Sequence, residues 1–146
     1  MTLFEELLYS KEFMMKTQDP YGKGLGIAEK FMEFGDVVME KNLYETDGPE
    51  RKCEIVFMLV KPIDTYSRLV VECEAKGWLR NGEGMINLNV RMFFRAETYQ
   101  AGFASSVFDK FYIQRASIFR KKAAEDSKKI TNFIEKLAVE QPSTAQ

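Results

Sequence analysis

The chain of 146 residues contains no histidine. It therefore lacks the side chain that most often serves as a general base at neutral pH and most often binds metal ions. Glutamate, aspartate, tyrosine, lysine and cysteine remain, but their spacing identifies no reaction. We predict no catalytic residue, no metal site and no cofactor, and we expect a binding role rather than an enzymatic one. An enzyme that works by shaping a pocket around a reactive substrate stays open as an alternative.

Two glutamates, Glu72 and Glu74, lie two residues apart and thus on one face of a predicted strand. Paired carboxylates can act as acid and base, or hold a divalent cation through oxygen ligands. No third ligand is near them in the sequence. We therefore expect a solvated polar face that also carries Lys76.

The stretch Gly22-Lys23-Gly24-Leu25-Gly26 precedes a predicted short helix. Helix N-termini attract phosphate, so such a turn could cradle an anion. No strand precedes it, and neither the dinucleotide-binding nor the P-loop spacing is present. A flexible connection between two helices is the simpler interpretation.

The two cysteines, Cys53 and Cys73, fall in consecutive predicted strands. If those strands pair through a turn near Lys61–Thr65, residues whose numbers add to about 126 face each other. This register predicts that the two thiols are close cross-strand neighbours. A disulfide or redox pair is one interpretation; we expect two buried, reduced thiols that act as small hydrophobic groups.

The C-terminal third of the chain combines basic and aromatic residues, as single-stranded RNA binding would require. The aromatics, however, fall on the stripe that should face the core, and acidic residues dilute the charge. We therefore expect a solvated helix face and no nucleic-acid partner. The basic residues are Lys110, Arg115, Arg120, Lys121, Lys122, Lys128 and Lys129.

The elements that must position these residues indicate an α+β fold. Apolar residues from Leu3 to Met15 recur at three- and four-residue spacing, which predicts an amphipathic helix of about four turns. A second short helix is expected over 25–34, after the break at Asp19-Pro20-Tyr21-Gly22. The chain would thus begin with N-terminal helices.

The middle of the chain predicts an antiparallel β-meander of about four strands, because apolar and polar residues alternate over 68–79 and 86–95. Asp47-Gly48 and Asn81-Gly82 are strong hairpin signals. The expected strands are Asp36–Glu45, Lys52–Val60, Arg68–Leu79 and a fourth that contains Ile86–Phe94.

From about Ser105 the apolar period becomes that of a helix, which we expect to pack on the sheet. If unbroken to Glu140 this helix is about 50 Å long, whereas the strands span only about 30–35 Å. It must overhang, break near Ala123-Ala124, or find another partner. An overhang would expose an apolar stripe, which predicts a homodimer interface. The stripe consists of Ile130, Phe133, Ile134 and Leu137.

The order of these elements from about Gly24 to Leu137 resembles the START/Bet v 1-like helix-grip proteins. In that superfamily a curved antiparallel sheet wraps a long C-terminal helix and encloses an apolar cavity. The family has one strand before its two short helices and six after them, whereas this sequence predicts a helix at the start and four strands. The resemblance rests on the element order and on the apolar face Phe108, Phe111, Tyr112, Ile118 and Phe119.

The resemblance, together with 12 phenylalanines and 8 methionines, implies a binding domain that holds an apolar small molecule or lipid between the sheet and the C-terminal helix. A protein-interaction or homodimerisation domain carries similar weight. Trp78 could line a pocket mouth or cap the end of the core. The residues expected to contact a ligand are Phe57, Trp78, Phe94, Phe108, Phe111, Tyr112 and Phe119.

The composition fits one domain over 1–140, with a disordered tail at 141–146. The net charge of −1 excludes a global basic field for nucleic acid or membranes. No apolar run approaches the roughly 20 residues of a membrane span, and acids stand near the N-terminus where a secretory signal would carry basic residues. These features predict a cytoplasmic protein.

Overall fold

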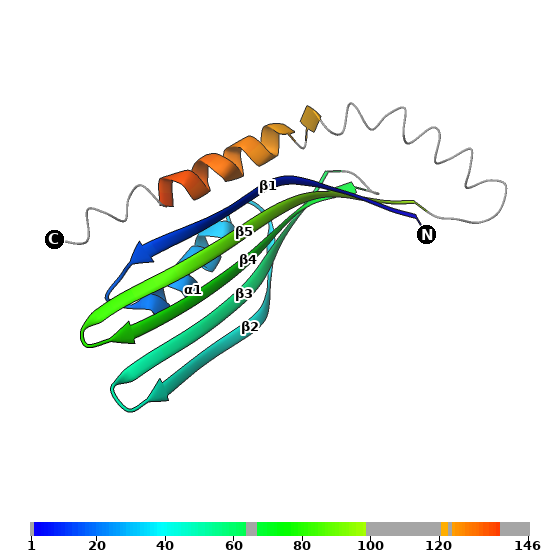
Figure 1. Ribbon diagram of the computed structural model, residues 1–146. Helices are drawn as coiled ribbons and strands as arrows, with labels where there is room; N and C mark the ends of the chain where they lie inside the picture. The colour runs from blue at the N-terminus through cyan, green and yellow to red at the C-terminus, as the bar shows by residue number, and fades with distance from the viewer. Residues whose placement is uncertain (1, 64–66, 99–120, 123, 138–146) are drawn as a thin grey trace.

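The computed structural model describes residues 2–63, 67–98, 121–122 and 124–137. Their fold is α+β, as predicted, with five antiparallel strands where four were expected. The strand order in the sheet is β1-β5-β4-β3-β2 (Figure 1). In chain order the elements are β1 (Thr2–Lys16), α1 (Pro20–Phe31), β2 (Asp36–Asp47), β3 (Glu50–Pro62), β4 (Ser67–Arg80) and β5 (Glu83–Thr98), followed by a helix at 124–137.

The predicted N-terminal helix is wrong, because Thr2–Lys16 is strand β1 and pairs along its length with β5. The register slips between Leu7 and Tyr9, where a β-bulge accommodates Leu8. A bulge adds one residue and moves the following side chains to the other face. Phe13 and Met15 consequently lie in the core while Leu7 is exposed.

The glycine-rich stretch does not form a flexible connection, because it lies inside α1. The helix begins at Pro20, and the Asp19 side chain accepts a hydrogen bond of 3.1 Å from the Gly22 amide. The helix N-terminus is thus capped by its own carboxylate. At Gly24 a side chain would meet the Ile55 Cδ1 atom at 2.7 Å, so the glycine lets α1 approach β3 closely.

The hairpin signals are confirmed. Asn81 and Gly82 both have positive φ, 53° and 78°, which a two-residue turn between twisted strands requires. Gly48 also has a positive φ, in the turn between β2 and β3.

The predicted faces of β4 and β5 are also confirmed, and they form the core. The inner face of the sheet is apolar across four strands, and each of its members is almost wholly buried. These residues include Phe13 and Met15 on β1, Ile55, Phe57 and Leu59 on β3, Leu69, Val71, Cys73 and Ala75 on β4, and Ile86, Leu88, Val90, Met92 and Phe94 on β5.

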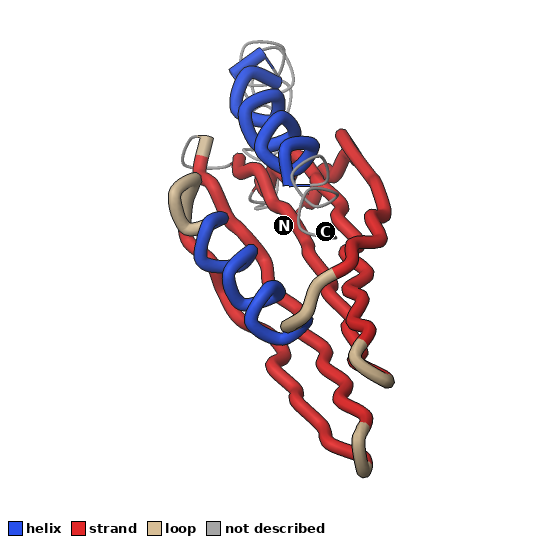
Figure 2. The backbone as a smooth tube through the Cα atoms, turned by 90° about the vertical axis from the view of Figure 1, so that its left-hand side faces the viewer, coloured by secondary structure: helices blue, strands red, loops and turns tan. Residues whose placement is uncertain are grey.

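Both helices cover this inner face (Figure 2). Phe31 at the end of α1 contacts Phe57 of the sheet, with ring centroids 5.4 Å apart, and Phe133 of the helix 124–137 at 5.0 Å. One aromatic side chain therefore joins the sheet to both helices. Among the described residues, no helix is both long and apolar enough to cross a lipid bilayer.

The predicted register of β3 and β4 is wrong. The numbers of paired residues add to 130 where about 126 was predicted. Cys53 pairs with Gly77, and Cys73 pairs with Phe57. Four residues correspond to about 13 Å along a strand, so the two cysteines are not cross-strand neighbours. The expectation of two free, buried thiols is confirmed.

Because the chain begins with a strand, the element order is strand, helix, antiparallel strands and helix. This order removes one departure from the helix-grip arrangement that the sequence resembles. Four strands follow α1 here, so the sheet is still shorter than that arrangement implies.

Candidate functional site

The candidate site is the space between the inner face of the sheet and the helix 124–137. Phe57 and Phe94, two of the expected ligand contacts, lie on this face and are 0% and 1% exposed. Trp78 does not join them. It lies on the opposite face of β4, half-buried beside Lys52 and Lys76. The other expected contacts, Phe108, Phe111, Tyr112 and Phe119, lie outside the described residues.

The stripe expected to form a dimer interface packs against the chain's own sheet. Ile130 and Ile134 are 0% exposed and Leu137 is 3% exposed, while Phe133 lies between Phe31 and Phe34. The premise that these side chains need a second chain to cover them is therefore wrong. They form one apolar wall of the candidate site.

A polar contact fixes the outer side of this helix to strand β1. The Lys11 ammonium donates to both carboxylate oxygens of Glu135 at 2.8 Å, and the Tyr9 hydroxyl donates to the same carboxylate at 2.9 Å. The hydrogen bond from Lys11 is the largest cause of the lowered pKa of Glu135, and the hydrogen bond from Tyr9 adds to it. Burial, aided by the bond to Glu135, raises the pKa of Tyr9.

A second contact joins the helix to β3 at the other end of its described length. The Lys61 ammonium lies 3.3 Å from a carboxylate oxygen of Asp126, which is almost buried. With the contact at Glu135, this pair ties both ends of the described helix to the sheet. We call these two contacts, Lys11–Tyr9–Glu135 and Lys61–Asp126, the clasp.

The clasp could not be read from the sequence. Lys11 and Glu135 are separated by 124 residues, and Tyr9 and Lys11 lie on a strand that was predicted to be a helix. Acidic residues on the expected solvated face were the sole signal, and they were interpreted as dilution of the basic charge.

Among the buried members of the apolar core cluster that the described residues form, Cys73 is the one with an ionisable side chain. Burial raises the pKa of its thiol well above the ordinary value, and the Glu72 carboxylate adds to this effect. The thiol is therefore neutral at physiological pH. It is a small apolar group between Phe57 and Val90, its partners on β3 and β5.

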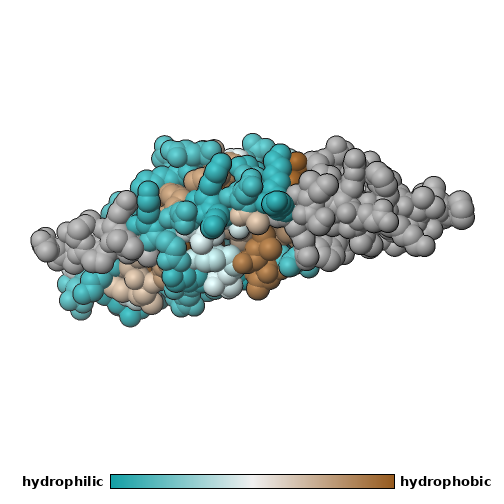
Figure 3. All heavy atoms as spheres, turned by 90° about the horizontal axis from the view of Figure 1, so that it is seen from above, coloured by the Kyte–Doolittle hydropathy of each residue, from teal (hydrophilic) through white to brown (hydrophobic). Residues whose placement is uncertain are grey.

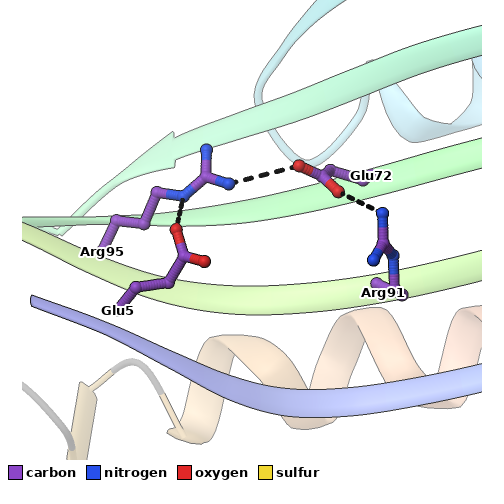
Figure 4. A network of polar contacts seen from close by, with 4 residues as sticks. All are labelled: Glu5, Glu72, Arg91 and Arg95. Carbon is purple, nitrogen blue, oxygen red and sulfur yellow. Dashed lines mark hydrogen bonds and ion pairs between the residues drawn. The ribbon is translucent and has the colours of Figure 1, made fainter.

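The outer face of the sheet carries a polar network instead (Figure 4). Glu72 accepts hydrogen bonds from Arg91 at 3.0 Å and from Arg95 at 3.2 Å, and Arg95 also donates to Glu5. Glu74 pairs with Lys76 at 3.0 Å. The two glutamates are thus neutralised by separate cations, as a solvated face would be.

No three metal-ligating side chains cluster within the described part of the chain. An open groove of about 300 Å³ crosses the network near Glu72, Glu74 and Arg91. A second groove, of about 250 Å³, lies beside Trp78. Both lie on the outer face, and their mixed charges select no particular ligand.

The chemistry of the inner compartment is simple by comparison. Its described walls are aliphatic and aromatic, and its thiol is neutral. Among the described residues, these walls offer no general acid, base or nucleophile at neutral pH.

No protein-family model matches the chain, and no curated protein matches it. Among solved structures, one described as "Crystal structure of Ara h 8.0201" aligns with 82% of this chain and 98% of its own, at 15% sequence identity and a TM-score of 0.25. A likeness at this TM-score carries no argument about fold or ligand.

Proposed function

We propose that this protein binds an apolar small molecule or lipid between the inner face of its sheet and the helix 124–137. The observation that supports this proposal is the apolar character of both walls. Ile130, Ile134 and Leu137 face a sheet whose inward side chains are hydrophobic on β1, β3, β4 and β5.

The chemistry of the walls sets the ligand class. A charged group that entered this compartment would lose its hydration without gaining a partner, which is strongly unfavourable. An acyl chain or another hydrocarbon skeleton gains about 25 cal/mol for each Å² of apolar surface that it buries. A polar head would have to remain at the rim, where the clasp groups Lys11 and Glu135 are exposed.

Access requires movement of the helix, because the compartment is filled in this conformation. Phe57 and Phe94 have essentially no exposed surface. The helix 124–137 is attached by apolar contacts, which an apolar ligand can replace, and by the clasp at its outer side. We therefore propose that this helix moves outward to admit the ligand.

Two measurements test the proposal. Native mass spectrometry of the purified protein shows whether a small molecule co-purifies, and titration with the fluorescent fatty acid cis-parinaric acid measures binding directly. We expect binding of about one molecule per chain with a micromolar dissociation constant, which is about −8 kcal/mol.

A matched pair of variants locates the site. Val90→Phe places a larger side chain on the inner face beside Cys73, whereas Val56→Phe makes the same change on the outer face. We expect Val90→Phe to weaken binding of the fatty acid at least tenfold and Val56→Phe to leave it unchanged, with the far-ultraviolet circular dichroism spectrum of both preserved. If no molecule co-purifies and wild-type protein does not bind the probe, the proposal is wrong.

A further inference from the structure

The charges on the C-terminal helix are sorted by face. Its two paired acids, Asp126 and Glu135, turn toward Lys61 and Lys11 of the sheet. Its lysines are exposed on the other side, and within the described residues none of them has an ion-pair partner. These are Lys121, Lys122, Lys128, Lys129 and Lys136. We call them the lysine face.

The lysine face is strongly basic for its size. Asp126 and Glu135 are paired with Lys61 and Lys11, and Glu125 is the remaining acid among the described residues of this segment. Five lysines thus stand against one glutamate on this side, an excess of four positive charges. The residues from 124 to 136 span about 20 Å of helix. The whole chain has a net charge of −1, so the patch is a local concentration of charge and not a reflection of the average.

The lysine face is open to contact. The helix lies above β1 in Figure 1, and a view from above shows hydrophilic side chains over the middle of that surface (Figure 3). The apolar side of the helix is buried against the sheet. A partner would therefore meet ammonium groups on this side and no hydrophobic stripe.

We propose that the lysine face docks the protein onto an anionic membrane surface. Each lysine close to such a surface contributes about 1 kcal/mol, and several lysines on one rigid helix can act together. A single-stranded nucleic acid fits less well, because it needs aromatic side chains on which bases stack. The exposed side chains described on this face include none.

The docking surface would place the moving helix of the proposed binding site directly against lipid. It rests on the lysines and not on ligand binding, so the two proposals can fail separately. Docking is expected for protein that carries no ligand.

The test is co-sedimentation of the full chain with phosphatidylcholine vesicles, with and without phosphatidylserine, at low and at physiological salt. We expect binding only to vesicles that contain phosphatidylserine, and weaker binding as salt rises, because salt screens the attraction. The double variant Lys128→Gln/Lys129→Gln should reduce the partition coefficient about thirtyfold, the equivalent of two lysines.

The matched control is Lys52→Gln/Lys76→Gln, which removes the same charge from the outer face of the sheet, away from the helix. It should bind like wild type. Equal loss in both double variants would overturn the proposal, since only net charge would then matter. Absence of binding to anionic vesicles would overturn it as well, and so would tighter binding to a single-stranded RNA oligonucleotide than to vesicles. Binding of cis-parinaric acid is measured separately and decides only the proposed function.

Discussion

At the scale of single residues, glycines determine how closely α1 approaches the sheet. A Cβ atom at Gly77 would lie 2.6 Å from Cβ of Pro20 and 2.8 Å from Sγ of Cys53. Both distances are shorter than any ordinary contact, so the start of α1 would have to move. We expect Gly77→Ala to lower the free energy of unfolding by about 1–3 kcal/mol, as overpacking of a core does.

Gly26 on the same helix provides the control. A Cβ atom there would meet nothing within 4 Å, and alanine is favoured over glycine in a helix by about 1 kcal/mol. Gly26→Ala should therefore raise the stability measured by urea denaturation. Stabilisation by Gly77→Ala as well would show that the close approach of α1 to β4 is incorrect.

The Cys73 thiol should make the stability depend on pH. Its pKa is raised in the folded protein, so the folded state keeps the proton under conditions where the unfolded state releases it. The stabilisation is complete below the pKa of an unfolded thiol, about 8.5, and declines as the pH rises above that value. The loss should approach about 1.4 kcal/mol per pH unit.

Cys73→Ala should remove this component, whereas Cys53→Ala should retain it. Urea denaturation between pH 7 and pH 10 under reducing conditions measures the difference. Identical pH profiles for wild type and Cys73→Ala would show that the thiol is not buried as described.

At the scale of elements, the sequence predicted β4 and β5 well, because uninterrupted alternation of apolar and polar residues has no helical equivalent. It failed at β1 for a physical reason. Alternation places Leu7 outward, and the bulge at Leu8 then shifts Tyr9 and Phe13 inward. The resulting apolar spacing of three and four residues imitates a helix, and only pairing with β5 resolves the ambiguity.

The register of β3 and β4 failed for a different reason. The turn was expected near Lys61–Thr65, but Pro62 is the last residue of β3 and pairs with Arg68. Proline is tolerated at such a position because little of the hydrogen-bond ladder is lost there. The turn therefore comes later, and every cross-strand partner shifts with it.

For the helix 124–137, apolar contacts should outweigh the clasp. The side chains of Lys11 and Glu135 are 46% and 42% exposed, and exposed ion pairs contribute less than about 1 kcal/mol. Ile134, the preceding residue, is fully buried. We expect Ile134→Ala to lower the free energy of unfolding by about 2–5 kcal/mol and Glu135→Gln to lower it by less than about 1 kcal/mol.

Urea denaturation of both variants compares the two losses of unfolding free energy at adjacent positions of one helix. A larger loss from Glu135→Gln than from Ile134→Ala would show that the clasp, and not the apolar wall, holds the helix. The proposed ligand could not then displace the helix simply by replacing apolar contacts.

At the scale of the whole molecule, the candidate site is built from segments that are far apart in the sequence. Phe57 and Ile134 were both singled out from the sequence, but they were assigned to a ligand site and a dimer interface, respectively. In the folded chain both belong to the core that joins the sheet to the helices. Tertiary pairing of strands and helix decides that assignment, and hydrophobic periodicity alone cannot supply it.

The proposed function requires the helix 124–137 to open separately from the rest of the domain. Parts of a protein can open with less free energy than global unfolding. Cys73 lies in the core cluster beside Phe57, while Cys53 lies beneath the start of α1, near Pro20.

If the helix opens alone, Ile134→Ala should accelerate labelling of Cys73 by a thiol reagent about thirtyfold or more, the equivalent of 2 kcal/mol, in a Cys53→Ser background. In the Cys73→Ser background the same substitution should leave labelling of Cys53 unchanged. Equal acceleration at both thiols would mean that the domain opens as one unit, and the helix could then not act as a gate.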